Sequence, residues 1–391
     1  MNNIKKPIVI VGSGFGGMNA ALHFKKNNPE FSVLVIDSKS QFEFKPLLYE
    51  VFSDEIKSWE VNPSFESIYS NTGITFLRNQ VNLIDFNKNF LILQDNLKVE
   101  FEYLILSTGS SPNDFSIKGV KKYCSFFSTN EDQLNLKKLL DKKISVGQTK
   151  KIFIIGAGPT GVELACKVSD LYESKFQINI VEKTSEILNN SKVFNKEEAE
   201  KTLEKKNINL MRNCSVIEIN DEEILLSNKL NKQIKFPYCE VIWTAGIKPN
   251  LPKFDKEIQR INNKILINDN LQLKEFPNIF AIGDISKVET NNYFPVTAQV
   301  AMQQGIHVAC NLKLLINNEK LLPFKFNDNG EMMSLGIGEA SVCGLGLTLS
   351  GKLAFDLRRI IYAYKMPKIG RSLKSTASWF LEKKSIFKGI L

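Results

Sequence analysis

The sequence has few histidines, no closely spaced cysteines and no long apolar run. Only two histidines occur in 391 residues, and the six cysteines show neither C-x-x-C nor C-x4-C spacing. We therefore expect no metal site and no redox-active disulfide. No stretch of about eighteen consecutive apolar residues appears, so we expect no membrane-spanning helix.

Acidic residues are scarce at the C-terminal end. The net charge is +9, and residues 350–391 contribute ten basic and two acidic side chains to it. The preceding residues are together close to neutral. A partner that recognises positive charge would therefore meet this end of the chain.

A Gly-rich turn at residues 12–17 follows a β-branched run and opens a predicted helix. The next predicted strand ends in Asp37, and strand, turn, helix, strand and acid is the context in which G-x-G-x-x-G indicates a dinucleotide site. Gly12 permits the tight turn, Gly14 lets the backbone approach a pyrophosphate, and Gly17 lets helix and strand pack closely. The helix N-terminus supplies amides to the phosphates, and the acid accepts from ribose hydroxyls.

The same pattern recurs at residues 156–161, with Glu182 as the acid. The distance from first glycine to acid is 25 residues in the first copy and 26 in the second. Each copy later has a strand that runs into a Thr and a Gly, ending at Gly109 and at Gly246. Such self-similarity predicts a duplicated nucleotide-binding unit. A protein that holds two dinucleotides is expected to transfer something between them.

The second copy is predicted to be inserted into the first, because a further strand at residues 278–282 ends in Gly283 and Asp284. This arrangement resembles the two-dinucleotide flavoproteins, in which such a strand closes the FAD domain and its Asp binds the ribityl chain of the flavin. An ordinary turn is the alternative interpretation.

The fold class that follows is α/β, with two nested Rossmann-like domains and a C-terminal amphipathic helical tail. We assign residues 1–112 and 250–322 to an FAD-binding domain, 113–249 to an NAD(P)H-binding domain and 323–391 to a C-terminal membrane-associating segment.

Over nearly its whole length the chain resembles the type II NAD(P)H:quinone oxidoreductases, single-subunit FAD enzymes. Within them it is most similar to the cyanobacterial and plastid branch, which is associated with reduction of demethylphylloquinone. The stretches that carry the branch resemblance are Phe42 to Glu50, Trp59 to Pro63, Leu322 to Phe326 and Gly330 to Gly336.

Residues 297–305 are similar to the A-Q-x-A-x-Q motif of the quinone site in that family. On a helix Gln299 and Gln303 share one face, and their amides can hydrogen-bond quinone oxygens without adding charge. Ala298 is small enough to let a flat ring come close. A solvated polar face on an ordinary helix is the alternative.

Two further candidates come from the resemblance. The Glu that matches Glu163 lies by the nicotinamide and flavin in the family, and a capping role at the start of its helix explains this residue equally well. Lys45 resembles a position that lines the flavin, where a cation could stabilise the reduced ring. A surface lysine is the competing interpretation.

Charge at the second acid bears on the choice of nicotinamide cofactor. Glu182 accepts from a ribose 2′-OH and would repel a 2′-phosphate, which favours NADH. However, Lys183 is adjacent, and the branch that the chain resembles includes enzymes that use NADPH. We therefore expect NAD(P)H without choosing between the two forms.

The tail is predicted to contain a helix over residues 351–365, with an apolar stripe from Leu353 to Tyr364 beside Arg358, Arg359 and Lys365. A second basic and aromatic segment follows Pro367. Such segments suit an anionic bilayer surface, which predicts peripheral attachment to the cytoplasmic face of the plasma or thylakoid membrane. A helix packed on its own domain and a dimer contact are the alternatives. No nucleic-acid motif accompanies the charge, so no nucleic acid partner is expected.

The predicted activity is FAD-dependent transfer of two electrons from NAD(P)H to a naphthoquinone-type quinone. Two alternatives are a respiratory enzyme that feeds a bulk membrane quinone pool and a nucleotide-sensing flavoprotein with low turnover. A homodimer follows only from the family resemblance. The predicted FAD-binding residues are Gly12, Gly14, Phe15, Gly16, Gly17, Asp37, Lys45, Thr108, Gly109, Gly283, Asp284 and Ala298, and the predicted NAD(P)H-binding residues are Gly156, Gly158, Pro159, Thr160, Gly161, Glu182, Ala245 and Gly246.

Overall fold

A computed structural model describes residues 6–147, 151–237, 239–290 and 294–367. The chain divides into two compact units. Unit 1 comprises residues 1–42, 63–111 and 248–327, and unit 2 comprises 43–62, 112–247 and 328–391. This division differs from the expected domains, since residues 43–62 and everything from 328 onward belong to unit 2.

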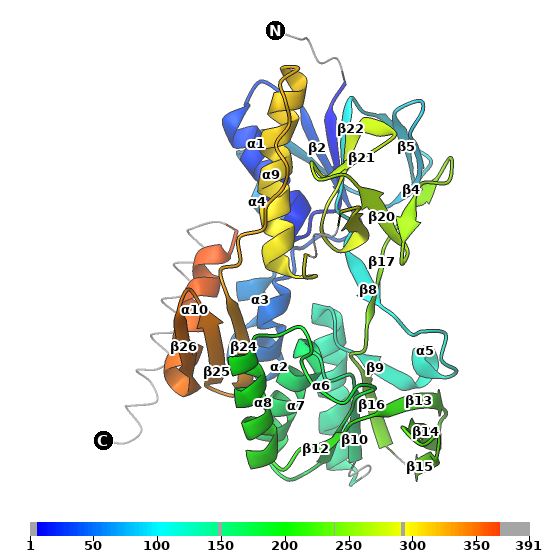
Figure 1. The fold of residues 1–391 in the computed structure, drawn as a ribbon, viewed down its shortest axis with the longest axis vertical. Coiled ribbons are helices and arrows are strands. Elements are labelled where there is room, and N and C mark those ends of the chain that lie inside the picture. The colour runs from blue at the N-terminus through cyan, green and yellow to red at the C-terminus, as the bar shows by residue number, and fades with distance from the viewer. Residues whose placement is uncertain (1–5, 148–150, 238, 291–293, 368–391) are drawn as a thin grey trace. The chain divides into compact units, whose positions relative to one another are not determined.

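Unit 1 contains a six-stranded sheet in the order β21-β22-β7-β1-β2-β3. All neighbours are parallel except the pair at the edge formed by β21. Helices α1 (Phe15–Asn27) and α9 (Ala298–Ile316) pack against each other (Figure 1). The strands are β1 (Ile8–Val11), β2 (Val33–Asp37), β3 (Ile74–Arg78), β7 (Tyr103–Leu106), β21 (Gln272–Leu273) and β22 (Phe276–Ala281).

Two smaller sheets complete unit 1, in the orders β18-β4-β5-β6 and β19-β20-β23. Their strands, with the short helices of the unit, are α4 (Phe65–Tyr69), β4 (Val81–Asp85), β5 (Phe90–Leu93), β6 (Lys98–Glu100), β18 (Lys253–Phe254), β19 (Arg260–Ile261), β20 (Lys264–Ile267), η2 (Gly283–Ile285) and β23 (Ser286–Val288).

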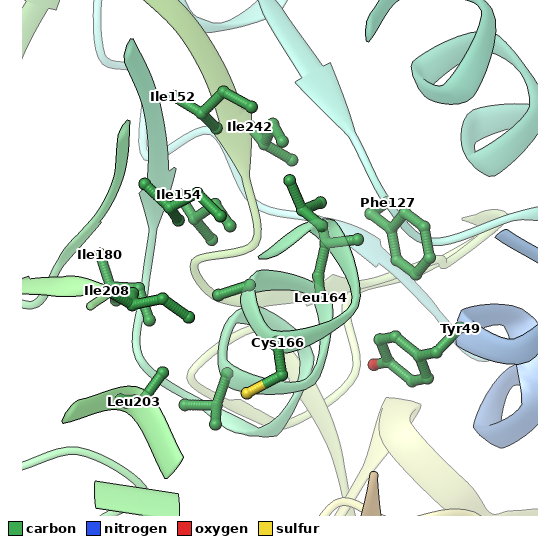
Figure 2. Packing of buried hydrophobic residues seen from close by; sticks show 14 of the residues in the cluster. Tyr49, Phe127, Ile152, Ile154, Leu164, Cys166, Ile180, Leu203, Ile208 and Ile242 are labelled. Carbon is green, nitrogen blue, oxygen red and sulfur yellow. The ribbon is translucent and has the colours of Figure 1, made fainter. Parts of the chain in front are cut away.

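Unit 2 contains a five-stranded parallel sheet in the order β12-β11-β10-β16-β9. Its strands are apolar because both faces of a parallel sheet are covered. Figure 2 shows part of the core on one face, where Ile152, Ile154 and Ile180 of the sheet lie near Leu164 and Cys166 of α7. The elements are β9 (Cys124–Phe126), α6 (Asn130–Ser145), β10 (Lys151–Ile155), α7 (Pro159–Tyr172), β11 (Gln177–Val181), α8 (Val193–Lys205), β12 (Asn209–Met211) and β16 (Cys239–Trp243).

An antiparallel sheet of three strands, β13-β14-β15, packs beside this core. It consists of β13 (Cys214–Ile219), β14 (Glu223–Asn228) and β15 (Gln233–Pro237). The short elements η1 (Lys45–Leu47), α2 (Leu48–Phe52), α3 (Ser58–Val61) and α5 (Val120–Tyr123) also belong to unit 2, while β8 (Ser110–Pro112) and β17 (Ile247–Pro249) stand where the chain passes between units.

The C-terminal part of unit 2 is more than a helical tail. A three-stranded antiparallel sheet of β24 (Glu331–Gly336), β25 (Glu339–Gly344) and β26 (Leu347–Ser350) precedes α10 (Gly351–Lys365). The predicted helix has the predicted bounds, but the sheet was not predicted. Residues 368–391, which carry the second basic segment, lie outside the described residues. No helix in the described ranges combines the length and the hydropathy needed to cross a membrane.

The α/β class with two Rossmann-like sheets is confirmed, and so is the duplicated order of elements. The first copy runs β1, α1, β2 and the second runs β10, α7, β11, each with a Gly-rich turn between strand and helix. The closing strand β22 pairs with β7 of the first copy, as the nesting requires. The described residues of the second copy therefore interrupt the first one in sequence.

The contact between α1 and α9 requires a residue without a side chain at Gly305. A Cβ atom there would lie 2.2 Å from the carbonyl oxygen of Gly16, so one helix would have to move. We expect Gly305→Ala to lower the free energy of unfolding by about 1–3 kcal/mol in urea titrations. This sign is opposite to the usual effect, because Gly→Ala within a helix normally stabilises a protein. Gly14→Ala is the control, because a Cβ atom there meets nothing within 4 Å. A Gly305→Ala protein as stable as the wild type would contradict the packing constraint.

Candidate active site

The first Gly-rich turn leaves room and amides for a phosphate group. Gly12 has a φ of +95°, and Gly14 is the N-cap of α1, with nothing within 4 Å of the position of a Cβ atom. Because glycine has no side chain, the N-cap side chain does not compete for the amides of the first turn, which suit an anion. Phe15 and Gly16 follow as the first residues of α1. The ring of Phe15 packs edge-to-face against that of Phe42, with the ring centroids 5.0 Å apart.

The acid at the end of β2 is tied to this turn. Asp37 accepts a hydrogen bond from the backbone N–H of Ser13 at its Oδ2 atom, at 2.6 Å. Its Oδ1 atom accepts from the N–H of Lys39 at 2.8 Å. The predicted ribose acceptor is thus held beside the turn that would bind the pyrophosphate.

The second copy repeats this geometry. Glu182 accepts from the N–H of Ala157 at its Oε2 atom, at 2.8 Å, so the donor is again the residue after the first glycine. A Cβ atom at Gly158 would meet nothing within 4 Å. Pro159 and Thr160 begin α7, where proline at the first helical position fits because its missing N–H has no helical acceptor.

In each turn a hydroxyl group that sequence reasoning missed donates to the carbonyl oxygen of the first glycine. The hydroxyl of Ser107 donates to the carbonyl oxygen of Gly12 at 2.7 Å. Thr244 occupies the same place in the second copy, donating to the carbonyl oxygens of Ile155 at 2.8 Å and Gly156 at 3.2 Å. Since Ser107 is equivalent to Thr244, the two threonines that the sequence suggested as a pair, Thr108 and Thr244, are not equivalent. Thr108 therefore corresponds to Ala245, and Gly109 to Gly246, with φ values of +67° and +65°.

Asp284 lies in η2 beside a partner that the sequence did not reveal. Its Oδ2 atom accepts from the hydroxyl of Ser110 at 2.5 Å. The N–H of the preceding Gly283, which has a φ of +72°, donates to Oε1 of the buried Gln304 at 2.7 Å. Gln304 of α9 thereby holds the backbone that presents Asp284. Gln304 lies about 140° around the helix from Gln299 and about 100° from Gln303, so it is on a different face from the glutamines that the motif emphasises.

The glutamine face of α9 is occupied by the chain itself. Gln303 donates from Nε2 to the carbonyl oxygen of Asn327 at 2.8 Å and accepts at Oε1 from the N–H of Asn327 at 2.9 Å. Asn311 makes the same two-point contact with Leu322, at 2.8 and 3.0 Å. Residues 322–327 thus form a strap along α9 within unit 1 that covers part of its polar face. The second N–H of Gln303 makes a long hydrogen bond to Gln299, which leaves one lone pair on Oε1 for another partner.

Ala298 is the first residue of α9, and Gln299 follows it, half-buried. The Oε1 atom of Gln299 lies 3.5 Å from Nε2 of Gln303. The structure therefore brings Gln299 and Gln303 together, as their spacing predicted. Their role in holding a quinone stays a prediction.

Unit 2 contains a buried charge cluster around Glu163. Arg358 of α10 is fully buried, forms an ion pair with Glu50 of α2 and lies 3.7 Å from Oε1 of Glu163. That Oε1 atom also accepts from the backbone N–H of Ser334 at 2.7 Å. The carbonyl oxygen of Pro46 accepts from Arg358 at 2.6 Å. The placement of Arg358 on a bilayer-facing basic stripe is therefore wrong: it is held inside unit 2 by carboxylates.

Burial and charge set the protonation of this cluster. Burial raises the pKa of Glu163 to about 7, against the opposing effects of Arg358 and the Ser334 N–H. Burial also raises the pKa of Tyr49, and the charge of Glu163 adds to that effect. Although burial opposes it, the charge of Arg358 holds the pKa of Glu50 below its ordinary value. One carboxylate is thus the permanent partner of the guanidinium, and the other titrates near neutral pH.

Glu163 is in the second turn of a helix whose N-cap is Gly158, and its carboxylate bonds outside that helix. The capping interpretation is therefore wrong for its side chain. Lys45 is exposed in η1 of unit 2, and its predicted place beside the flavin stays a prediction. In the described part of the chain, no group of three or more His, Cys, Asp or Glu residues is arranged to hold a metal.

Comparison with known proteins identifies similar oxidoreductases. Residues 6–305 match the family described as pyridine nucleotide-disulphide oxidoreductase. The chain is 31% identical to the demethylphylloquinone reductase NdbB of Synechocystis, over 97% of this chain and 96% of that protein. It is 29% identical to the alternative NAD(P)H-ubiquinone oxidoreductase C1 of Arabidopsis thaliana, over 97% of this chain and 81% of the relative.

A solved structure shares the fold. It is NDH2 from Plasmodium falciparum in complex with NADH, with a TM-score of 0.85 and 20% identity, over 97% of this chain and 98% of that one. The likeness extends through the C-terminal part of the described chain, which lies beyond the residues matched by the family.

The raised pKa of Glu163 predicts a pH dependence of stability. In the unfolded chain the carboxyl titrates near 4.5 and in the folded one near 7, so folding favours the protonated form. Its stabilising contribution is complete below pH 4.5 and is lost as the pH rises through 7. We expect Glu163→Gln to remove roughly 3 kcal/mol of the fall in unfolding free energy between pH 5 and pH 8. Urea unfolding at several pH values measures this.

The exposed Glu66→Gln of α4 is the matched control and should leave the pH profile unchanged. Parallel profiles for the wild type and Glu163→Gln would show that Glu163 does not titrate in this range.

Proposed function

Because the chain belongs to the pyridine nucleotide-disulphide oxidoreductase family, we propose that it is an FAD-dependent enzyme that oxidises NAD(P)H and reduces a quinone. The observation that carries the proposal is the repeated contact between acid and turn, Asp37 with Ser13 and Glu182 with Ala157. In each copy the turn would bind phosphate and the acid would accept from a ribose. Two such sites fit two dinucleotides. The name of one relative gives NAD(P)H and ubiquinone as its substrates, and the name of the other gives demethylphylloquinone.

Unit 1 would hold FAD. The amides after Gly14 suit its pyrophosphate, Asp37 a ribose, and Asp284 the ribityl hydroxyls, with Gln304 fixing the backbone beside it. When bound, FAD supplies the redox chemistry, taking two electrons from NAD(P)H and passing them to the quinone. Unit 2 would hold NAD(P)H in the turn from Gly156 to Gly161, with Glu182 as the ribose acceptor.

Glu163 would supply or hold a proton for this reaction. A carboxyl that titrates near 7 can exchange a proton at neutral pH, and Arg358 limits how far burial raises that value. A quinone needs two protons as well as two electrons to become a quinol. Gln299 and Gln303 would donate to its oxygens, with the quinone replacing the long bond of 3.5 Å between the two amides. A naphthoquinone such as demethylphylloquinone is the proposed acceptor, because of the similarity to NdbB over nearly both chains.

Flavin absorbance tests this function directly. We expect NADH, added without oxygen to the purified yellow protein, to bleach the flavin band, and a demethylated naphthoquinone to restore it. Failure to bleach would contradict the proposal. Bleaching without reoxidation by any quinone would favour a nucleotide sensor, and faster turnover with ubiquinone than with the naphthoquinone would favour a respiratory role.

A bilayer surface is the proposed location, because unit 2 exposes an apolar face. On α10, Leu353 is 73% exposed, Ile360 51% and Tyr364 88%, and Leu345 in the turn before β26 is 85% exposed. Three members of the predicted stripe are thus exposed, while Leu357 packs against the cluster of Ala340 and Phe355 and Arg358 points inward. Apolar side chains at a surface bind the lipid interface when basic residues flank them. A homodimer stays a prediction.

Vesicle binding tests this docking. We expect Leu353→Glu combined with Ile360→Glu to reduce co-sedimentation with phosphatidylglycerol vesicles at least roughly tenfold, because two apolar contacts are replaced by like charge. Val193→Glu is the control, since Val193 is 71% exposed on α8. Equal binding of both variants would refute the docking face. Deletion from residue 350 is unsuitable, because it removes Arg358 and leaves Glu50 without its buried partner.

A further inference from the structure

The carboxylate of Glu182 already accepts three hydrogen bonds from the protein. Its Oε2 atom accepts from the N–H of Ala157 at 2.8 Å. Its Oε1 atom accepts both from the N–H of Thr184 at 2.9 Å and from the hydroxyl of Thr184 at 2.8 Å. Two of the three donors therefore belong to one residue.

These three bonds leave little acceptor capacity. A carboxylate offers about four lone-pair directions, two on each oxygen. Both directions on Oε1 are used by Thr184, and one on Oε2 by Ala157. Among the described residues, no further protein donor reaches the last direction, which is on Oε2 beside the Gly-rich turn. One ribose hydroxyl can bind there.

Thr184 is itself held from several sides. Its hydroxyl oxygen accepts from Nδ2 of Asn189 at 2.9 Å, and its carbonyl oxygen accepts from the N–H of Asn213 at 3.0 Å. The hydroxyl has a single proton and two acceptors at 2.8 Å, Glu182 and the carbonyl of Glu186. A carboxylate is the stronger acceptor of the two, so the proton is directed to Glu182.

The first copy lacks this hydroxyl. The residue two positions after its acid is Lys39, whose backbone N–H donates to Asp37 and whose side chain has no hydroxyl. The backbone contacts to the acid are therefore common to both copies, whereas a hydroxyl two positions after the acid is present only in the second. A feature present at one nucleotide site and missing at the other points to a difference in what the two sites select.

We propose that Thr184 is a positioning residue that locks Glu182 and thereby sets the preference of this site for NADH over NADPH. The proposal rests on the proposed function, because it takes Glu182 as the ribose acceptor. A free 2′-hydroxyl donates to the remaining direction on Oε2. A 2′-phosphate has no proton to donate there, and it meets a negative group that cannot rotate away. The adjacent Lys183 is exposed and is available to a 2′-phosphate only if Glu182 yields.

Binding of the oxidised cofactors to the FAD-loaded protein tests this. Calorimetric titration with NAD⁺ and NADP⁺ gives the two dissociation constants and their ratio for each variant. We expect Thr184→Val, which keeps the shape and removes the hydroxyl, to shift the ratio at least about tenfold toward NADP⁺, the lower end of the range for a hydrogen bond to a charged group. Thr184→Ser should retain the wild-type ratio. Glu182→Gln marks the largest shift the site can show.

Thr202→Val is the matched control, because the hydroxyl of Thr202 bonds only a helix carbonyl, that of Glu198, among the described residues. A ratio for Thr184→Val equal to that of Thr202→Val would overturn the proposal while leaving the function intact, since NAD⁺ would still bind. Failure of the wild-type holoenzyme to bind either nucleotide would instead refute the proposed function. A shifted ratio in Thr184→Ser would also overturn the proposal, because the serine retains the hydroxyl.

Discussion

The structure depends on how closely a helix can approach the Gly-rich turn that precedes it. At Gly17 a Cβ atom would lie 1.9 Å from the carbonyl oxygen of Gly12, and at Gly161 it would lie 1.9 Å from that of Gly156. No other residue type fits at that separation. Because the helix must start against the strand end, its first amides converge on the place where the acid after the next strand is also held. Both nucleotide sites follow from this one steric constraint.

A second constraint acts within unit 2, where charges are buried. A lone guanidinium in the protein interior is costly, so Arg358 requires Glu50, and the pair then influences Glu163. Similarly, the fully buried Lys167 forms an ion pair with Glu55. These pairs join α2, α7 and α10, elements far apart in sequence. The C-terminal helix is thus part of unit 2, held there by its buried arginine.

Local pattern was sufficient wherever a residue acts through its own backbone or its nearest neighbours. The turn glycines need positive φ or small size, and the acids follow the next strand at a fixed distance, so both copies were found. It was insufficient for Ser107, Thr244 and Gln304, whose contacts join residues that are distant in sequence. It also misled for Arg358, because helical periodicity reports which residues share a face but not which face is covered.

The sequence by itself determined the fold class, the duplication, the nesting and the identity of the two acids, because these depend on the order of elements and on the steric needs of glycine. Only the tertiary structure decided the protonation environment of Glu163, the strap that occupies Gln303, and the hydroxyl of Thr184 on Glu182. Those features depend on burial and on directional hydrogen bonds, which a linear pattern does not specify.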